Sequence, residues 1–245
     1  MPSRPGRLLL LVPTESYRIG DFLAAARKGD IDVVVGSERR QALEKFSQGG
    51  TLTVDFRDIN RGVAMIEAYH NQYPLIGIVA IDDVSGLLAA TAARHLGLPG
   101  NDPEAVARTG NKHKLRQCLT GAGLAQPQFA IYPTDRDAIR LAATVTYPCI
   151  LKPLNLSASR GVIRADTEAE FIGAFERIRT ILGNLDGGEP ANPLQQILVE
   201  DYWSGEEVAL EGVMTDGQLQ VLALFDKRDP LEGPYFEETI YVTPS

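Results

Sequence analysis

The sequence has 245 residues, of which 44% are hydrophobic and 23% are charged, a composition typical of a globular protein with room for two structural units. The formal net charge of −8 and the pI of about 5.0 argue against a nucleic-acid-binding protein, because no basic face dominates. The two cysteines, Cys118 and Cys149, lie in apolar patterns, which predicts core residues in a reducing compartment. The apolar run at 8–12 is too short for a signal peptide or a membrane span, so we expect a cytoplasmic protein without a membrane contact.

Short apolar runs alternate with helical patterns through the first hundred residues. Strands are predicted at 7–12, 31–35, 51–56 and 75–81, and helices at 17–28, 62–71 and 86–96, the last capped by Ser85. This alternation favours a Rossmann-like parallel sheet with helices on both faces. The sequence contains neither a G-x-G-x-x-G turn nor a G-x-x-x-x-G-K-[ST] loop, so it gives no indication of a dinucleotide fingerprint or a P-loop.

The turn-rich segment 97–102 separates two predicted domains, 1–101 and 102–245. Asp102 followed by Pro103 predicts a helix start. The elements expected next are helices at 111–121, 135–145 and 166–182 and strands at 129–132, 149–151 and 196–200, with a flexible loop at 183–193. Two further strands between 208 and 225 are joined by Asp216-Gly217, a type I′ hairpin signal. A charged loop at 226–234 and a last strand at 238–242 complete an α+β pattern.

The stretch 147–165 carries the clearest chemical signal. Lys152 ends an apolar strand, and Pro153 is expected to stop that strand because it lacks a backbone N–H. The loop that follows is small and polar, with Asn155, Ser157, Ala158, Ser159 and Gly161. A second strand is predicted to begin at Val162. A lysine beside free N–H groups and hydroxyls suits a polyphosphate, although a surface hairpin with an ordinary lysine stays equally open.

Two carboxylates flank a later turn. Glu200 ends a predicted strand and Glu207 opens the next, with Ser204 and Gly205 between them. Acceptors in this arrangement can bind a purine amino group and the two hydroxyls of a ribose. Solvated acids at strand ends are the alternative. The basic turn at 112–116 also has two interpretations. It is either a solvated helix face or a place where one lysine is aimed at a phosphate.

Three stretches taken together resemble the ATP-grasp superfamily of carboxylate–amine and carboxylate–thiol ligases. They are GLPGNDPEAVARTGNKHKLRQCLTGAGLAQPQF, YPCILKPLNLSASRGV and ILVEDYWSGEEVALEGVM. The similarity covers nearly the whole chain and is closest to the L-amino-acid ligase and carbamoyl-phosphate-synthase-like branch. It implies a Rossmann-like leading domain followed by an ATP-grasp domain.

The resemblance also implies an ATP site. Lys112 and Lys152 resemble the family's two ATP-contacting lysines. The loop expected to close over the phosphates contains Ser157, Ala158, Ser159 and Gly161. This loop is less rich in glycine than is usual in the family, and Leu154 and Leu156 indicate a stiffer lid.

The adenosine half of the site follows from the same resemblance. Glu200 resembles the acid beside the adenine amino group, and Glu207 resembles the acid that binds the ribose. Asp201 and Trp203 are expected to offer backbone groups at the hinge. Lys227 resembles a lysine often found after the third strand.

The implied reaction uses ATP and Mg²⁺ to join a small carboxylate substrate to an amine co-substrate through an acyl phosphate, in a protein for which a homodimer is one expected state. The resemblance implies that the metal ligands and catalytic residues lie beyond Ser245, because in the family they follow a stretch like that at 240–245. Glu237 and Glu238 fit a solvated strand start better than a replacement for them. We therefore expect an ATP-grasp domain whose C-terminal portion is missing. The alternatives are a nucleotide-binding protein without ligase activity and an α/β sugar- or amino-acid-binding module.

Overall fold

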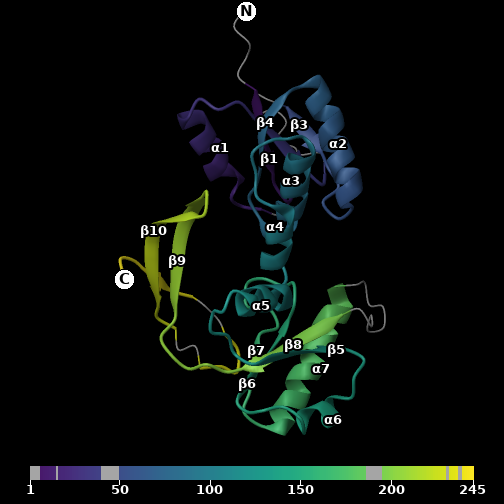
Figure 1. The fold of residues 1–245 in the computed structure, drawn as a ribbon, viewed down its shortest axis with the longest axis vertical. Helices are drawn as coiled ribbons and strands as arrows, with labels where there is room; N and C mark the ends of the chain where they lie inside the picture. Colours follow the sequence, from purple (N-terminus) through teal and green to yellow (C-terminus); the bar gives the residue numbers. More distant parts are fainter. Residues whose placement is uncertain (1–5, 15, 40–49, 186–194, 230–231, 237–238) are drawn as a thin grey trace, which may run out of the picture. The chain divides into compact units, whose positions relative to one another are not determined.

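The computed structural model describes residues 6–14, 16–39, 50–185, 195–229, 232–236 and 239–245. The chain divides into two compact units, residues 1–110 and 111–245, which share no sheet and no core (Figure 1). Among the described residues, none of the helices combines the length and the apolar run that a membrane crossing requires.

The first unit alternates strands and helices. Its elements in chain order are β1 (Arg7–Leu11), α1 (Ile19–Lys28), β2 (Val33–Ser37), β3 (Thr51–Thr53), α2 (Ile59–Gln72), β4 (Leu75–Ala80), α3 (Asp83–His95) and α4 (Pro103–Thr109). The strands are parallel, in the order β3-β2-β1-β4. This is the order of the first four Rossmann strands, which confirms the predicted Rossmann-like sheet.

Helices cover both faces of this sheet because β1 is apolar on both sides. Leu9 and Leu11 pack into a core with Ile66 of α2 and Leu88 of α3. The intervening Leu10 faces the other side, in a second core that includes residues of β2 and Ala26 of α1. Alternate side chains of a strand point to opposite faces, so a continuous apolar run is what a doubly covered strand requires.

Helix starts in the first unit differ from the prediction: α1 begins at Ile19 after Arg18, not at 17, and α2 and α3 each begin directly after an aspartate. Helix α2 begins at Ile59, not at 62, because the Asp58 side chain accepts a hydrogen bond from the Arg61 N–H at 3.0 Å. Helix α3 begins at Asp83, so the prediction that Ser85 caps it is wrong. Ser85 is buried inside the helix, and its hydroxyl donates to the Leu11 carbonyl at 3.4 Å.

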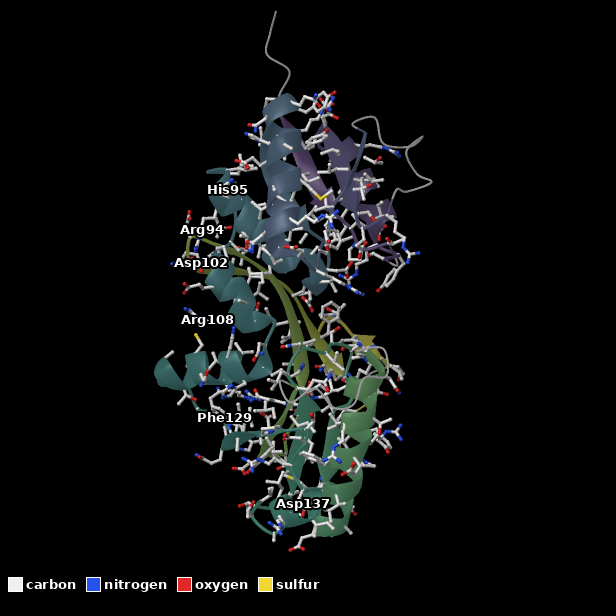
Figure 2. The ribbon with its side chains drawn as sticks, turned by 90° about the vertical axis from the view of Figure 1, so that its right-hand side faces the viewer. Arg94, His95, Asp102, Arg108, Phe129 and Asp137 are labelled. Atoms are coloured by element: carbon white, nitrogen blue, oxygen red, sulfur yellow. The ribbon has the colours of Figure 1, made fainter. Side chains whose placement is uncertain are left out.

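Asp102 caps α4 as predicted. Its carboxylate accepts from the N–H groups of Glu104 at 2.8 Å and Ala105 at 3.0 Å, and Pro103 occupies the first helical position. The same carboxylate forms an ion pair with Arg94 of α3, and the two side chains approach each other in Figure 2. This contact ties α4 to α3 within the first unit, which ends at Gly110.

The second unit is α+β, as predicted. Its elements are α5 (Lys112–Gly121), β5 (Phe129–Pro133), α6 (Ala138–Ala142), β6 (Cys149–Pro153), β7 (Ile163–Ala165), α7 (Glu168–Leu185), β8 (Gln196–Asp201), β9 (Val208–Thr215), β10 (Gln218–Lys227) and β11 (Tyr241–Val242). One antiparallel sheet has the order β5-β8-β6-β7, and a second has the order β11-β10-β9. Asp216 and Gly217 have φ values of 49° and 77°, which fits the predicted type I′ turn between β9 and β10.

The first of these sheets buries one face under α7. Leu151 of β6 and Val199 of β8 pack with Phe171 and Phe175, whose rings stack at 6.0 Å. Figure 1 shows α7 running along this sheet. Because side chains alternate, the neighbouring residues of β6 and β8 lie on the opposite face, and these include Lys152 and Glu200.

Several boundaries in the second unit also differ. Strand β6 includes both Lys152 and Pro153, so the strand does not stop before the proline. Strand β7 pairs with β6 only as far as Leu151, so the missing proline N–H falls where β6 has no partner on that side. The predicted helix at 135–145 is shortened to α6, because Asp137 caps it through the Ile139 N–H at 3.0 Å.

Three predictions near the end of the chain also change. Helix α7 continues to Leu185, and the remainder of the predicted loop at 183–193 lies outside the described residues, as do Glu237 and Glu238. Strand β10 continues to Lys227, and β11 contains only Tyr241 and Val242. Cys149 is buried as predicted, but Cys118 is exposed, because α5 buries none of its residues completely.

Candidate functional site

A cavity of about 340 Å³ lies over the polar face of the first sheet in the second unit. Six of the predicted site residues line it: Lys152, Ser159, Glu200, Asp201, Trp203 and Glu207. Strand pairing explains part of this grouping. Ile150 lies opposite Glu200 in the β6–β8 ladder, and Lys152 follows two residues along the same face.

Glu200 forms the buried centre of this cavity, with 5% of its surface exposed. Its carboxylate pairs with the Lys152 ammonium and accepts two hydrogen bonds from Arg116, Nε to Oε2 at 2.8 Å and Nη2 to Oε1 at 3.1 Å. Burial alone would raise the pKa of Glu200. The hydrogen bonds from Arg116 and the charge of Lys152 outweigh burial and lower that pKa below its ordinary value, so the carboxylate is ionised.

The contacts of Glu200 leave it one acceptor position. A carboxylate offers about four lone-pair sites, and the described contacts use two on Oε1 and one on Oε2. The fourth can accept one further hydrogen bond, which is what an exocyclic amino group of a purine would donate.

The hinge after β8 presents a free donor. The Asp201 N–H donates to the Gln128 carbonyl at 3.0 Å, and the Tyr202 N–H donates to the Pro148 carbonyl at 3.1 Å. Within the described part of the chain, the Trp203 N–H donates to no acceptor. The Trp203 amide is therefore a hinge donor able to bind a ring nitrogen.

Glu207 and Lys227 form an ion pair across the start of β9 and the end of β10. Glu207 is exposed, whereas the Lys227 side chain is 10% exposed and its Nζ lies 5.9 Å from the centre of the Tyr241 ring. Both residues also line a cavity of about 380 Å³ that shares Tyr202, Gly205 and Glu207 with the first cavity. The structure therefore brings Lys227 next to Glu207, and Glu207 to the cavity edge.

The loop at 157–161 lies beside the cavity. Ser159 lines both this cavity and a larger one of about 1300 Å³, which is also lined by Ser157, Ala158 and Gly161. Three loop residues have left-handed backbone angles: Ala158 (φ 55°), Ser159 (φ 52°) and Gly161 (φ 77°).

Lys112 lies against the segment before this loop, and it lines none of the three cavities above. Its ammonium donates to the Leu156 carbonyl, and its backbone N–H donates to the Leu154 carbonyl at 3.0 Å.

Arg116 is the residue of this site that the sequence did not single out. The sequence placed it in a basic turn without a separate role. Its spacing from Lys112, one helical turn along α5, was the available signal, because residues four apart share a helix face. The contact with Glu200 spans 84 positions of sequence and could not be foreseen from that spacing.

Metal-ligating side chains are not clustered in the described part of the chain. No group of three or more His, Cys, Asp or Glu side chains among the described residues could hold a metal ion. The described residues therefore form no all-protein metal cage, which Mg²⁺ bound to a nucleotide does not require, because one or two carboxylates and the phosphates can hold it.

Comparison with known families decides the affiliation. An ATP-grasp domain model matches residues 145–245, and an ATP-grasp N-terminal domain model matches residues 22–100. The chain belongs to the ATP-grasp superfamily. This confirms the resemblance that the sequence motifs indicated, and the parallel sheet followed by antiparallel sheets is the fold expected of it.

Individual proteins of known identity or structure are similar to this chain over much of its length. The large chain of carbamoyl phosphate synthase from Kocuria rhizophila is 27% identical over 185 residues, which are 74% of this chain and 15% of that protein. The L-amino acid ligase of Bacillus licheniformis superimposes with a TM-score of 0.74 at 21% identity, covering 99% of this chain and 56% of that one. The biotin carboxylase domain of the Hydrogenobacter thermophilus 2-oxoglutarate carboxylase, solved with MgADP and bicarbonate, gives a TM-score of 0.68 at 14% identity, covering 98% and 53%.

The chain spans a minor part of its curated relatives, from 15% of the carbamoyl phosphate synthase chain to 33% of the D-alanine–D-alanine ligase of Pseudomonas entomophila. It spans about half of the first solved structures it matches, 56% and 55%.

Proposed function

We propose that the cavity between β6, β8 and the hinge binds ATP. The observation that carries this proposal is the grouping of Lys152, Glu200 and the free Trp203 amide around one cavity. Lys152 supplies a cation for the phosphates, Glu200 an acceptor for the adenine amino group, and Trp203 a donor for a ring nitrogen. The exposed Glu207 at the cavity edge is the proposed ribose acceptor, with its carboxylate held by Lys227.

The proposed phosphate side is formed by the two lysines and the loop. Lys112 and the loop at 157–161 lie together, because the Lys112 ammonium binds a carbonyl at the base of the loop. We propose that this loop closes over the phosphates and excludes water, which strengthens the electrostatic contacts of both lysines. Catalysis of phosphoryl transfer depends mainly on such positioning and charge neutralisation.

We propose that the intact protein is a carboxylate–amine ligase. A substrate carboxylate oxygen attacks the γ-phosphorus of ATP and releases ADP, which gives an acyl phosphate. An amine nitrogen then attacks the acyl carbon, loses a proton and expels phosphate, which leaves an amide. Mg²⁺ is a proposed companion of the nucleotide, as in the MgADP complex of the biotin carboxylase domain.

The test is trapping of the acyl phosphate. The intact protein is incubated with Mg-ATP, hydroxylamine and a panel of small carboxylates, and hydroxamate and ADP are measured. We expect carboxylate-dependent formation of both products, lost in Lys152→Ala and retained in Lys114→Ala, which removes an exposed lysine of α5. Nucleotide binding without hydroxamate would favour the nucleotide-binding alternative. Absence of nucleotide binding would favour the sugar- or amino-acid-binding module. A homodimer stays a prediction, which analytical ultracentrifugation tests.

A further inference from the structure

Arg116 is the second cation on Glu200, and its contacts exceed those of a simple ion pair. It donates to both carboxylate oxygens, and its remaining terminal nitrogen, Nη1, donates to Gln126 Oε1 at 2.8 Å. The Gln126 amide is fixed in turn, because its NH₂ donates to the Ala125 carbonyl. Three nitrogens of one guanidinium thus meet three acceptors, and the side chain is 25% exposed.

We propose that Arg116 is a positioning residue that keeps Glu200 charged and in place when Lys152 turns from Glu200 to the nucleotide phosphates. This inference rests on the proposed ATP site and extends it. Arg116 lines the same cavity, but the role proposed for it rests on its contacts with Glu200 and not on a contact with the reacting atoms. It acts through Glu200.

The reason lies in the shared use of Lys152. In the structure its ammonium is bound to Glu200 Oε1, yet the proposed site requires that ammonium at a phosphate. A carboxylate that is 5% exposed is strongly destabilised when its cation leaves. Arg116 removes this conflict, because its two hydrogen bonds to Glu200 do not involve Lys152.

Arg116 is needed as a second cation because the other titratable side chains lining the cavity carry no positive charge. The remaining titratable side chains lining the cavity are Asp201, Tyr202 and Glu207, and none of them can be positive. Lys227, at the cavity edge, is paired with Glu207. Among the described residues that line this cavity, Arg116 is thus the cation left for Glu200 once Lys152 has moved.

An arginine suits this position better than a lysine. Its planar guanidinium donates to both oxygens of one carboxylate in a fixed geometry. A lysine ammonium is a point charge whose hydrogen bonds are less directional. Arg116→Lys therefore keeps the charge but loses the fixed geometry on Glu200 and Gln126.

Loss of Arg116 should therefore weaken the binding of ADP, which carries phosphates, more than the binding of adenosine, which carries none. Without Arg116, Lys152 can still neutralise Glu200 when adenosine binds, because adenosine carries no phosphate to attract the ammonium. When ADP binds, either Lys152 stays on Glu200 and the phosphates lose a cation, or Glu200 loses its last cation. In the second case burial raises the pKa of Glu200 and it takes up a proton.

The experiment is isothermal titration calorimetry of ADP and of adenosine with the full chain, at about pH 6, in two buffers of different ionisation enthalpy. We expect Arg116→Ala to weaken ADP binding by about 10- to 100-fold and adenosine binding by less than about threefold, given the usual strength of hydrogen bonds to charged groups. We also expect the net proton uptake with ADP to be larger in this variant than in the wild type, because the terminal phosphate of ADP, with a pKa of about 6, exchanges protons in both proteins. The ADP affinity of Arg116→Lys should lie between those of Arg116→Ala and the wild type. The ADP affinity of Lys114→Ala should match that of the wild type.

Different results would contradict the role of Arg116 and the ATP site itself. Equal losses for ADP and adenosine would show a merely structural role and overturn the inference, as would unchanged ADP affinity in Arg116→Ala while the wild type binds ADP. No ADP binding by folded wild type would instead overturn the ATP site, and this inference with it. If Arg116→Ala does not fold by circular dichroism, Arg116→Lys decides, because it must still weaken ADP more than adenosine.

Discussion

At the scale of the residue, Glu200 links the stability of the second unit to its proposed chemistry. Its ionised form is held by Arg116 and Lys152 against a burial effect of the opposite sign, so its pKa in the folded protein lies below the ordinary value of 4.5. A carboxylate whose pKa is lower in the folded than in the unfolded state stabilises the fold above the unfolded value. That stabilisation is lost as the pH falls through the folded value.

Glu200→Gln should therefore make the fold less sensitive to acid. We expect the wild type to lose free energy of unfolding between about pH 5 and about pH 3, and Glu200→Gln to lose less over the same interval, because it has no carboxylate to protonate. Urea denaturation at several pH values measures both slopes. Glu206→Gln, which removes an exposed acid nearby, is the control and should keep the wild-type slope. Parallel curves for wild type and Glu200→Gln would contradict the assignment.

The sequence could identify the side chains of the site individually but not their partners. Lys152 and Glu200 stand out because each lies at the end of an apolar strand, where polar groups are informative. Their ion pair, and the fork of Arg116 on Glu200, join positions 48 and 84 residues apart. Such contacts are set by strand pairing and helix docking, for which a single sequence carries no local signal.

At the scale of the element, the loop at 157–161 depends on a glycine. Gly161 has a φ of 77°, and a Cβ added there would lie 2.9 Å from Pro153 Cγ. Gly173 in helix α7 differs on both counts, because a Cβ there meets nothing within 4 Å and its φ is not positive. The two glycines form a matched pair for the same substitution.

Gly161→Ala should destabilise the fold by about 1–2 kcal/mol, the usual cost of a left-handed backbone for a residue with a Cβ. Gly173→Ala should stabilise it by about 0.5–1 kcal/mol, because alanine loses less entropy than glycine in a helix. Chemical denaturation of both variants against the wild type measures these shifts. A stable Gly161→Ala with an unchanged midpoint would show that the loop backbone is not held as described.

Element positions were predictable where an apolar period is strong, and their ends were not. The strands around Leu9 and Leu151 appear where the apolar runs predict them. The starts of α2 and α6 moved because the side chains of Asp58 and Asp137 cap them. Asp82 holds the N-cap position of α3 without a side-chain hydrogen bond, and the competing candidate Ser85 turned inward. Which polar residue serves as a cap depends on local backbone angles that apolar periodicity does not specify.

At the scale of the whole molecule, the two units have separate cores and should respond separately to core mutations. Ile66 is fully buried in the first unit, and Phe175 is fully buried in the second. Ile66→Ala and Phe175→Ala each remove a large buried side chain, which typically costs about 2–5 kcal/mol. We expect each to accelerate amide hydrogen exchange mainly in its own unit, measured by mass spectrometry. Equal acceleration in both units by either variant would contradict the division at residue 110.

The most direct test of the account is calorimetric titration of ATP into this chain, comparing the wild type with Lys152→Ala and Lys114→Ala. The account predicts saturable binding by the wild type and by Lys114→Ala. It predicts that Lys152→Ala lowers the ATP affinity by about tenfold or more, because a charge-assisted contact to a phosphate contributes that much. Wild-type affinity in Lys152→Ala, or no binding by a wild type that circular dichroism shows to be folded, would contradict the placement of the ATP site over β6 and β8.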